Sequence, residues 1–393
     1  MSFLARFLGP FHPHLVFDIA SKAYEHASQP LVAAYQYTAP IRQIYKDRRV
    51  PVKVVHGLIK SGRRASLLVA GAGPSIDYMV GRFFTQTLHA ETVGDVPLVD
   101  LTPTLRRLRA SADMTIAQLP RLWSRWLVDE YLRVPPWIGT RLPVPENPEQ
   151  FARRHKHIWK DMSPARRNGL RPRMSYEATE FDRFYHEMYV PYATRRFGEH
   201  AAIRPQRQLR RLLHRGGVLM WIYQAEERIA GALLRQHDHG LDLLSLGLAG
   251  TGEDARRAGA IPAIYYFSLE HARSQGCAVI DCGNSRPSPA DGVMWFKRKW
   301  GARLTPRTNI ASDLLFRWER PNQAVRTFLS HTPLIIQKGR ELSLVAALDD
   351  GDVRGAYQSL WMDGLDRLYV CKEDATIGSF VPGLTLVESL TNA

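Results

Sequence analysis

The chain has 393 residues, of which 45% are hydrophobic, and a formal net charge of +15. That length exceeds one ordinary hydrophobic core and favours two or three domains. No apolar run approaches the roughly 20 residues that a membrane-spanning helix needs, and three cysteines exclude a disulfide framework and a four-cysteine metal site. The composition fits a globular protein of the reducing cytoplasm.

The opening segment, MSFLARFLGPFHPHLVF, does not resemble a signal peptide, because its apolar region is broken and no small-residue cleavage site follows. We expect a helix packed on the body, with a short amphipathic contact with a membrane surface as the alternative. Helical pieces and loops are expected to about residue 60.

Strand and helix patterns alternate in the next part of the chain, up to a proline-rich stretch. We expect a strand at 66–70, a Gly-Ala-Gly-Pro-Ser turn, a helix at 76–88, a strand at 97–101 and a helix at 119–132. The loop at 134–148 is the best candidate for a domain boundary.

After that loop the pattern predicts helices, then an antiparallel meander of three strands, and then a long helix followed by a further strand. The expected elements are a basic helical stretch, helices at 180–196 and 205–215, antiparallel strands at 218–223, 229–236 and 241–248, a helix at 261–274, a strand at 277–280, a short helix and a last strand. Two helices are expected within 321–348. This order predicts an α+β (mixed α/β) fold with one mixed central sheet flanked by helices.

Positive charge is concentrated in residues 151–215, which hold sixteen Lys and Arg against six Asp and Glu. Such a concentration indicates an anionic partner: nucleic acid, a nucleotide-linked substrate or an anionic membrane face. The alternative is a solvated, arginine-rich helix surface.

The segment GCAVIDCGNSRPSPADGVMWFKRKWGARL (276–304) places a cationic helix beside the carboxyl end of a buried strand. Phe296 and Trp300 are four residues apart, so a helix puts both on one face. Cys277 and Cys282 are interpreted as small hydrophobic filler of that strand.

Several segments resemble one family. RIAGALL (228–234) looks like the central strand of the GNAT (N-acetyltransferase) fold, and FKRKWG (296–301) resembles the Phe-Lys-x-x-Phe-Gly pattern of FemABX-like transferases and the related BioF2-like acetyltransferases. SPARRNGL (163–170), FDRFY (181–185) and RRFG (195–198) are similar to segments that open that domain. The resemblance covers about residues 150–335.

The resemblance implies three parts of the chain. Residues 1–150 are expected to form an α/β partner domain, for which a degenerate GNAT-like half is one interpretation. Residues 151–335 are expected to form the GNAT-like transferase domain, and residues 336–393 a helical extension packed on the body.

The resemblance also implies transfer of an acyl or aminoacyl group to an amine, without a metal or a permanently bound cofactor. The donor is acyl-CoA or aminoacyl-tRNA, and the basic 151–215 segment suits tRNA through phosphate contacts. The expected acceptor is an amine-bearing small molecule, a peptide or a cell-envelope precursor. A cytoplasmic location is expected, with a peripheral membrane contact as an addition.

Phe296 and Lys297 match the Phe-Lys pair of those transferases, so the resemblance places them at the reacting end of the donor. A lysine there can stabilise the oxyanion formed when an amine attacks an ester or thioester carbonyl. Asp281 is expected to orient the amine or act as a base, or instead to bond its own backbone. Core packing of Phe296 with a surface Lys297 is the alternative.

Other predicted substrate contacts are Asn284 and Arg286 in the loop, Arg298 on the short helix, and one of the adjacent Tyr265 and Tyr266 on the long helix. Loop solubility explains Asn284 and Arg286 equally well.

The predicted CoA-binding residues are Arg256, Arg257, Gly259 and Ala260, which stand where GNAT enzymes hold the CoA pyrophosphate at a helix start. Ile261 stands where that pattern has a Gly or Ala, which leaves the donor open.

Two rival sites are weaker in the sequence. The Gly71-Ala72-Gly73 turn lacks the third glycine of a dinucleotide fingerprint, and Pro74 removes an N–H from the phosphate cradle. The fourteen histidines are scattered, so no metal site is expected. The competing hypothesis is a non-catalytic protein that binds RNA or an anionic membrane through residues 151–215.

Overall fold

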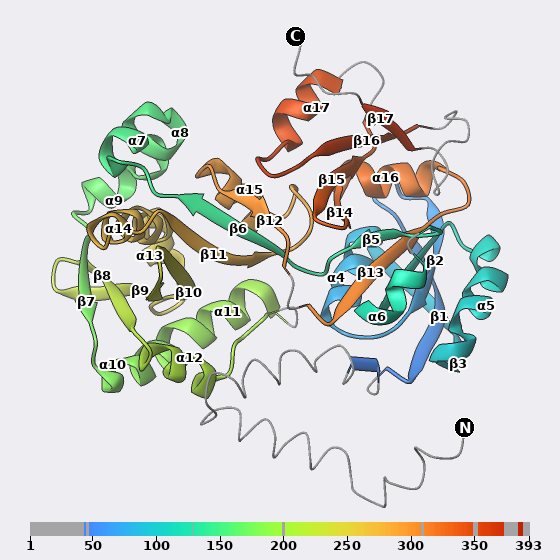
Figure 1. Ribbon diagram of the computed structural model, residues 1–393, viewed down its shortest axis with the longest axis horizontal. Helices are drawn as coiled ribbons and strands as arrows, with labels where there is room; N and C mark the ends of the chain where they lie inside the picture. The colour runs from blue at the N-terminus through green and yellow to red at the C-terminus, as the bar shows by residue number, and fades with distance from the viewer. Residues whose placement is uncertain are drawn as a thin grey trace, which may run out of the picture.

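In the computed structural model, the described part of the chain forms three mixed β-sheets with helices packed on them (Figure 1). The structure describes residues 43–44, 47–127, 129–198, 201–307, 310–348, 353–372 and 384–387. The opening segment, expected to form a helix or a membrane contact, lies outside the described residues. None of the described helices is both long enough and apolar enough to cross a membrane.

The first sheet has six strands in the order β3-β1-β2-β4-β13-β5. One face packs on α4 (Pro74–Phe83) and α16 (Gln323–His331), and the other packs on α5 (Leu98–Leu108). Its strands are β1 (Arg49–Leu58), β2 (Arg64–Ala70), β3 (Gln86–Pro97), β4 (Met114–Pro120), β5 (Leu132–Val134) and β13 (Ser312–Arg317).

The second sheet has seven strands in the order β12-β6-β11-β10-β9-β8-β7 and contains the expected meander. Its strands are β6 (Ile138–Pro143), β7 (Arg171–Ser175), β8 (Gly217–Gln224), β9 (Glu227–His237), β10 (Gly240–Leu248), β11 (Val279–Ser285) and β12 (Arg303–Thr305). The predicted crossover helix is α14 (Ala260–Ser274), which joins β10 to the parallel β11.

Helices cover both faces of the seven-stranded sheet. One face packs on α14, whose Ile264 and Leu269 are fully buried. The other packs on aromatic and leucine side chains such as Phe184 and Leu209. The further helices are α7 (Pro148–Arg154), α8 (Lys156–Asp161), α9 (Ser163–Arg167), α10 (Ala178–Arg183), η3 (Phe184–Tyr189), α11 (Val190–Phe197), α12 (Gln206–Leu213), α13 (Glu253–Arg257) and α15 (Gly292–Lys299).

The two large sheets exchange strands. β6 precedes residue 150 but pairs with β11 and β12 in the second sheet, and β13 follows that sheet in sequence but pairs with β4 and β5 in the first. The expected division at residues 150 and 335 stays a proposal. The proline-rich stretch expected to be a boundary contains β6, a mostly buried strand whose last residue is Pro143.

The third sheet has four strands in the order β14-β15-β16-β17 and contains much of the C-terminal part. Its strands are β14 (Leu334–Lys338), β15 (Glu341–Ala346), β16 (Arg367–Cys371) and β17 (Leu384–Val387). The C-terminal extension, expected to be helical, thus contributes strands as well as α17 (Val353–Leu360).

Four local predictions were wrong, all for short apolar runs that strands and helices share. Residues 49–58 form β1 rather than helical pieces, and 98–101 begin α5 rather than a strand. Residues 119–132 contain the end of β4, α6 (Arg121–Ser124) and η2 (Arg125–Leu127), and the second helix expected within 321–348 is β14 and β15.

Candidate active site

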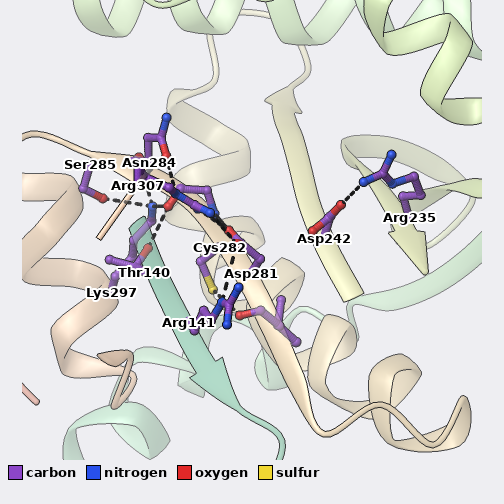
Figure 2. Close-up of polar contacts among 12 residues, drawn as sticks. Thr140, Arg141, Arg235, Asp242, Asp281, Cys282, Asn284, Ser285, Lys297 and Arg307 are labelled. Atoms are coloured by element: carbon purple, nitrogen blue, oxygen red, sulfur yellow. Dashed lines mark hydrogen bonds and ion pairs between the residues drawn. The ribbon is translucent and has the colours of Figure 1, made fainter. Parts of the chain in front are cut away.

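The parallel ladder between β10 and β11 stops at two aspartates. It pairs only three residues of each strand, ending with Asp242 opposite Asp281, although both strands continue. Like charges directly opposite each other are destabilising, and each carboxylate here has its own arginine. Asp242 accepts from Arg235, and Asp281 accepts from Arg307 (Figure 2).

Asp281 is held as a carboxylate. Arg307 donates to both of its oxygens, at 2.8 and 2.6 Å, and the N–H of Gly283 donates to Oδ1 at 2.8 Å. Burial alone would raise the pKa of Asp281, but the bonds from Arg307 outweigh it and hold the pKa below its usual range. Such a carboxylate is a weak base, so this geometry favours the alternative in which Asp281 bonds its own backbone.

Arg307 reaches Asp281 by crossing β6 at Gly139. A Cβ at Gly139 would lie 2.4 Å from Arg307 Nε, so any other residue there would have to displace this guanidinium. Nε also donates to Asn284 Oδ1 at 2.9 Å. Arg307 therefore fixes two predicted site residues at once, although no sequence pattern singled it out.

Lys297 lies inside the protein at the end of β11. The helix α15 is capped by Asp291, whose Oδ1 accepts from the N–H groups of Val293 and Met294. From this helix the Lys297 ammonium donates to Ser285 Oγ at 2.9 Å, and Lys297 is only 3% exposed.

Backbone oxygens complete the surroundings of that ammonium. Lys297 Nζ also donates to Asn284 O at 3.2 Å and Gly283 O at 3.5 Å, so its three bonds all go to neutral oxygens. Burial lowers the pKa of Lys297 to about 8. The alternative interpretation, in which Lys297 lies on the surface, is excluded. Lys297 is a buried cation at the end of β11.

A β-bulge in β11 orients the carbonyl groups of Gly283 and Asn284 toward Lys297. The register against β6 shifts between Asp281 and Asn284, and Gly283 has φ +74°, a conformation that favours glycine. Gly283 O accepts from Thr140 Oγ1 at 3.0 Å as well as from Lys297. Cys282 lies within the bulge, and burial raises its thiol pKa to about 12, so it is a neutral filler as expected.

Aromatic rings line the side of α15 that faces α14. The Phe296 and Tyr265 rings are 5.0 Å apart and nearly perpendicular, and Tyr265 also contacts Trp300 at 5.6 Å. Tyr265 is buried at 5% exposure, and burial raises its pKa well above the usual range. Tyr266 lies half-buried on another side of α14, where burial and Glu270 raise its pKa.

Arg286 and Arg298 bond to neighbouring elements in the structure. Arg286 is 6% exposed, stacks between Tyr78 and Trp137, and donates to Ser75 Oγ at 3.0 Å. Arg298 donates to the backbone oxygen of Ser359 in α17. The structure thus brings Lys297, Asp281 and Asn284 together and holds these two arginines in packing contacts.

The predicted CoA loop is covered. A Cβ at Gly259 would lie 2.6 Å from the backbone nitrogen of Ala165 in α9, and Ala260 is fully buried. The N–H groups of Ala258 and Gly259 are used inside the α13 turn, and Pro262 has none. Arg256 and Arg257 point away as exposed partners of Glu253 and Asp254.

The basic 151–215 segment is spread over several helices and a strand, and part of its charge is neutralised locally. Arg153, Arg171, Arg183 and Arg210 each pair with an acidic side chain. Trp159 of α8 lies between the guanidinium groups of Arg153 and Arg166, at 4.8 and 3.5 Å from the ring centroid.

A pocket of about 330 Å³ lies apart from the Lys297 cluster, beside β7 and α10. Part of its polar lining is paired: Arg228 donates to Glu180 and to Tyr223, and Trp221 donates to Glu180. No predicted site residue lines it.

A search of solved structures finds similar chains. FemX matches with a TM-score of 0.38 and 11% identity, over 71% of this chain and 90% of that one. The C-terminal domain of a putative lysylphosphatidylglycerol synthetase from Agrobacterium fabrum matches with 0.32 and 12%, over 71% and 87%. A GCN5-related N-acetyltransferase from Kribbella flavida matches with 0.29 and 10%, over 88% and 80%.

No protein-family model and no curated protein matches the chain. FemX and the GCN5-related enzyme belong to the two groups that the sequence motifs resemble. TM-scores below 0.5 with identities near 10% do not decide the activity, which has to be argued from the site residues.

Proposed function

We propose that the chain transfers an acyl or aminoacyl group from an ester or thioester to an amine at the carboxyl end of β11, beyond the point where its pairing with β10 stops. The observation that carries the proposal is the Lys297 ammonium, buried without a carboxylate in hydrogen-bond contact. A cation in a water-poor site stabilises a developing oxyanion far more than a solvated one does. The match of Phe296 and Lys297 to the FemABX-like pattern supports the same role.

In this mechanism the amine attacks the donor carbonyl, and the negative charge that develops on the carbonyl oxygen is stabilised by Lys297. The contact from Nζ to Gly283 O, at 3.5 Å, is the longest of the three and is the one that a substrate oxygen replaces. Collapse of the tetrahedral intermediate keeps the new C–N bond and breaks the bond to the donor oxygen or sulfur, which takes up the proton lost by the amine and leaves as the alcohol or thiol. Asp281 acts by fixing Arg307 and the bulge. Asn284 is exposed and its Oδ1 is bonded to Arg307, so its side-chain NH2 group is the part that contacts the acceptor.

Of the two donor classes, aminoacyl-tRNA is favoured. The start of α14 is covered at Gly259 by Ala165 of α9, and the N–H groups of Ala258 and Gly259 are already bonded, which counts against a CoA pyrophosphate there. The helix that covers it, α9, belongs to the basic 151–215 segment, whose arginines suit phosphate contacts. The cytoplasmic location and the peripheral membrane contact stay predictions.

The test measures loss of the acyl group from acetyl-CoA, longer acyl-CoAs and charged tRNA in the presence of a panel of amines. Lys297→Met keeps the length of the side chain and removes the charge. It should lower kcat by about 10²–10³ with little change in KM, the loss typical of one oxyanion contact. The control is Lys299→Met on the same helix, where the lysine pairs with Asp161 outside the cluster.

Unchanged turnover in a folded Lys297→Met protein would refute the assigned role. The competing hypothesis, polyanion binding without catalysis, predicts no transfer with any donor. It also predicts RNA affinity that falls steeply with salt and is equal in wild type and Lys297→Met.

A further inference from the structure

Two histidines and a glutamate meet on the outer strands of the six-stranded sheet, where β3 pairs with β1 (Figure 1). His56 lies directly opposite His89 in the ladder, and Glu91 follows two residues after His89. Because side chains alternate along a strand, all three lie on one face. Glu91 Oε1 is 3.6 Å from Nε2 of His56 and 3.5 Å from Nε2 of His89.

These separations suit the ligands of a single metal ion. Tetrahedral Zn²⁺ with bonds of about 2.0–2.1 Å holds its ligand atoms roughly 3.3 Å apart. The three ligand atoms here all lie within 4.8 Å of one another. Two imidazole nitrogens and one carboxylate favour zinc and its transition-metal neighbours over Mg²⁺ and Ca²⁺, which prefer oxygen ligands.

We propose that His56, His89 and Glu91 bind a divalent transition-metal ion of the Zn²⁺ class, with water in the remaining position. The two imidazole rings are stacked, with centroids 4.5 Å apart and planes 12° apart, so their nitrogen lone pairs run nearly parallel. Binding turns one ring about its Cβ–Cγ bond until both lone pairs converge. The side chains are 32% and 59% exposed, which leaves room for that rotation.

The proposed metal site lies at the edge of the six-stranded sheet. Among the described strands β3 pairs only with β1, and most of its residues are exposed. A metal held by His56 on one strand and by His89 and Glu91 on the other ties the two strands through side chains. The proposed metal site lies on the six-stranded sheet, whereas Lys297 bonds to β11 of the seven-stranded sheet, so the metal site is independent of the proposed transfer reaction.

The test uses the full chain without a histidine tag, stripped with a chelator and titrated calorimetrically with Zn²⁺ and, separately, Mg²⁺. One Zn²⁺ per chain should bind, with no comparable binding of Mg²⁺. His89→Ala removes a ligand and should weaken Zn²⁺ binding at least about tenfold. Glu91→Gln, which keeps the shape but loses the charge, should also weaken it.

The matched control is His239→Ala, which removes an exposed histidine from the turn between β9 and β10 and should leave Zn²⁺ affinity unchanged. Co²⁺ in place of Zn²⁺ should give the strong visible absorption of a tetrahedral site in wild type and His239→Ala, and not in His89→Ala. Absence of Zn²⁺ binding in wild type overturns the proposal. So does equal affinity in wild type and the His56→Ala, His89→Ala double variant, because the ion is then held elsewhere.

Discussion

Each of the two large sheets contains one parallel strand pair among the described residues, and the two pairs end differently. In the six-stranded sheet β2 and β4 pair over four residues, from Leu67 with Met114 to Ala70 with Ala117, all of them fully or almost fully buried. In the seven-stranded sheet the pair β10 and β11 ends on opposed carboxylates, beside a buried lysine.

This difference distinguishes residues that contribute only to packing from residues that can also take part in a reaction. The apolar end of the β2–β4 pair adds stability through burial and carries no charged side chain that could act in a reaction. A polar ladder end gains little net stability, because each buried charge must be matched by a partner. We therefore expect substitutions at the first end to change stability alone and substitutions at the second to change activity as well.

The largest effect on stability should come from the apolar pair. Leu68→Ala leaves a cavity at a fully buried position and should lower the free energy of unfolding by about 3–5 kcal/mol. Urea unfolding gives this number, and transfer activity per folded molecule should be unchanged. Leu241→Ala, at an equally buried position in the other ladder, should cost a similar amount. A much smaller cost there would mean that β10 and β11 are loosely packed along their whole pairing.

The two opposed aspartates offer a matched pair. Asp281→Asn leaves Arg307 without its carboxylate and should lower the free energy of unfolding by about 3 kcal/mol. Asp242→Asn removes the partner of Arg235 at a position of similar exposure, 16% against 15%, and should cost about as much. Only Asp281→Asn should lower transfer activity. Equal activity in both variants would contradict the placement of the site on the β11 side.

The buried lysine should make stability depend on pH in the alkaline range. Between its folded pKa of about 8 and its usual value of 10.5, Lys297 is neutral in the folded state and charged in the unfolded state. The unfolded state then binds more protons, so stability rises with pH, by up to about 2 kcal/mol between pH 8 and 9.5. The measurement is the difference in urea-unfolding free energy between wild type and Lys297→Met at each pH. A difference that is constant with pH would show that Lys297 is solvated.

The smallest effect should come from the crossing of Arg307 over β6. Gly139→Ala places a methyl group against the guanidinium and should cost about 1 kcal/mol. Displacement of Arg307 should lower transfer activity. Arg307→Ala in the same chain should relieve only part of the steric cost, because Thr305 Oγ1 also lies 2.6 Å from that Cβ position. A Gly139→Ala protein with full activity would mean that the position of Arg307 does not matter for the reaction.

Local periodicity was enough to predict the meander, α14 and the helix that presents Lys297, because neighbours in sequence determine those patterns. The same information places the helix that carries Lys297 beside the carboxyl end of the β11 strand. It does not give Arg307, which meets Asp281 only because β6 inserts between β11 and β12 and has a glycine at the crossing point.

Contacts between segments that are distant in the sequence explain why two other features were not predicted. The histidines are scattered along the sequence, and His56 and His89, which are distant in it, meet only through the register of β1 and β3. Likewise, the covering of Gly259 by Ala165 depends on how α9 packs against α14, and no spacing in the sequence reports it.

The exchange of β6 and β13 between the two large sheets also sets the order in which the chain can fold during synthesis. The six-stranded sheet lacks its link between β4 and β5 until residue 317 has left the ribosome, and the seven-stranded sheet must retain β6 while β7 to β11 are made. Contacts of this sequence separation form slowly, and incomplete sheets present open edges. The nascent chain should therefore depend on chaperones until late in its synthesis, and a fragment cut at residue 150 should aggregate more readily than the full chain.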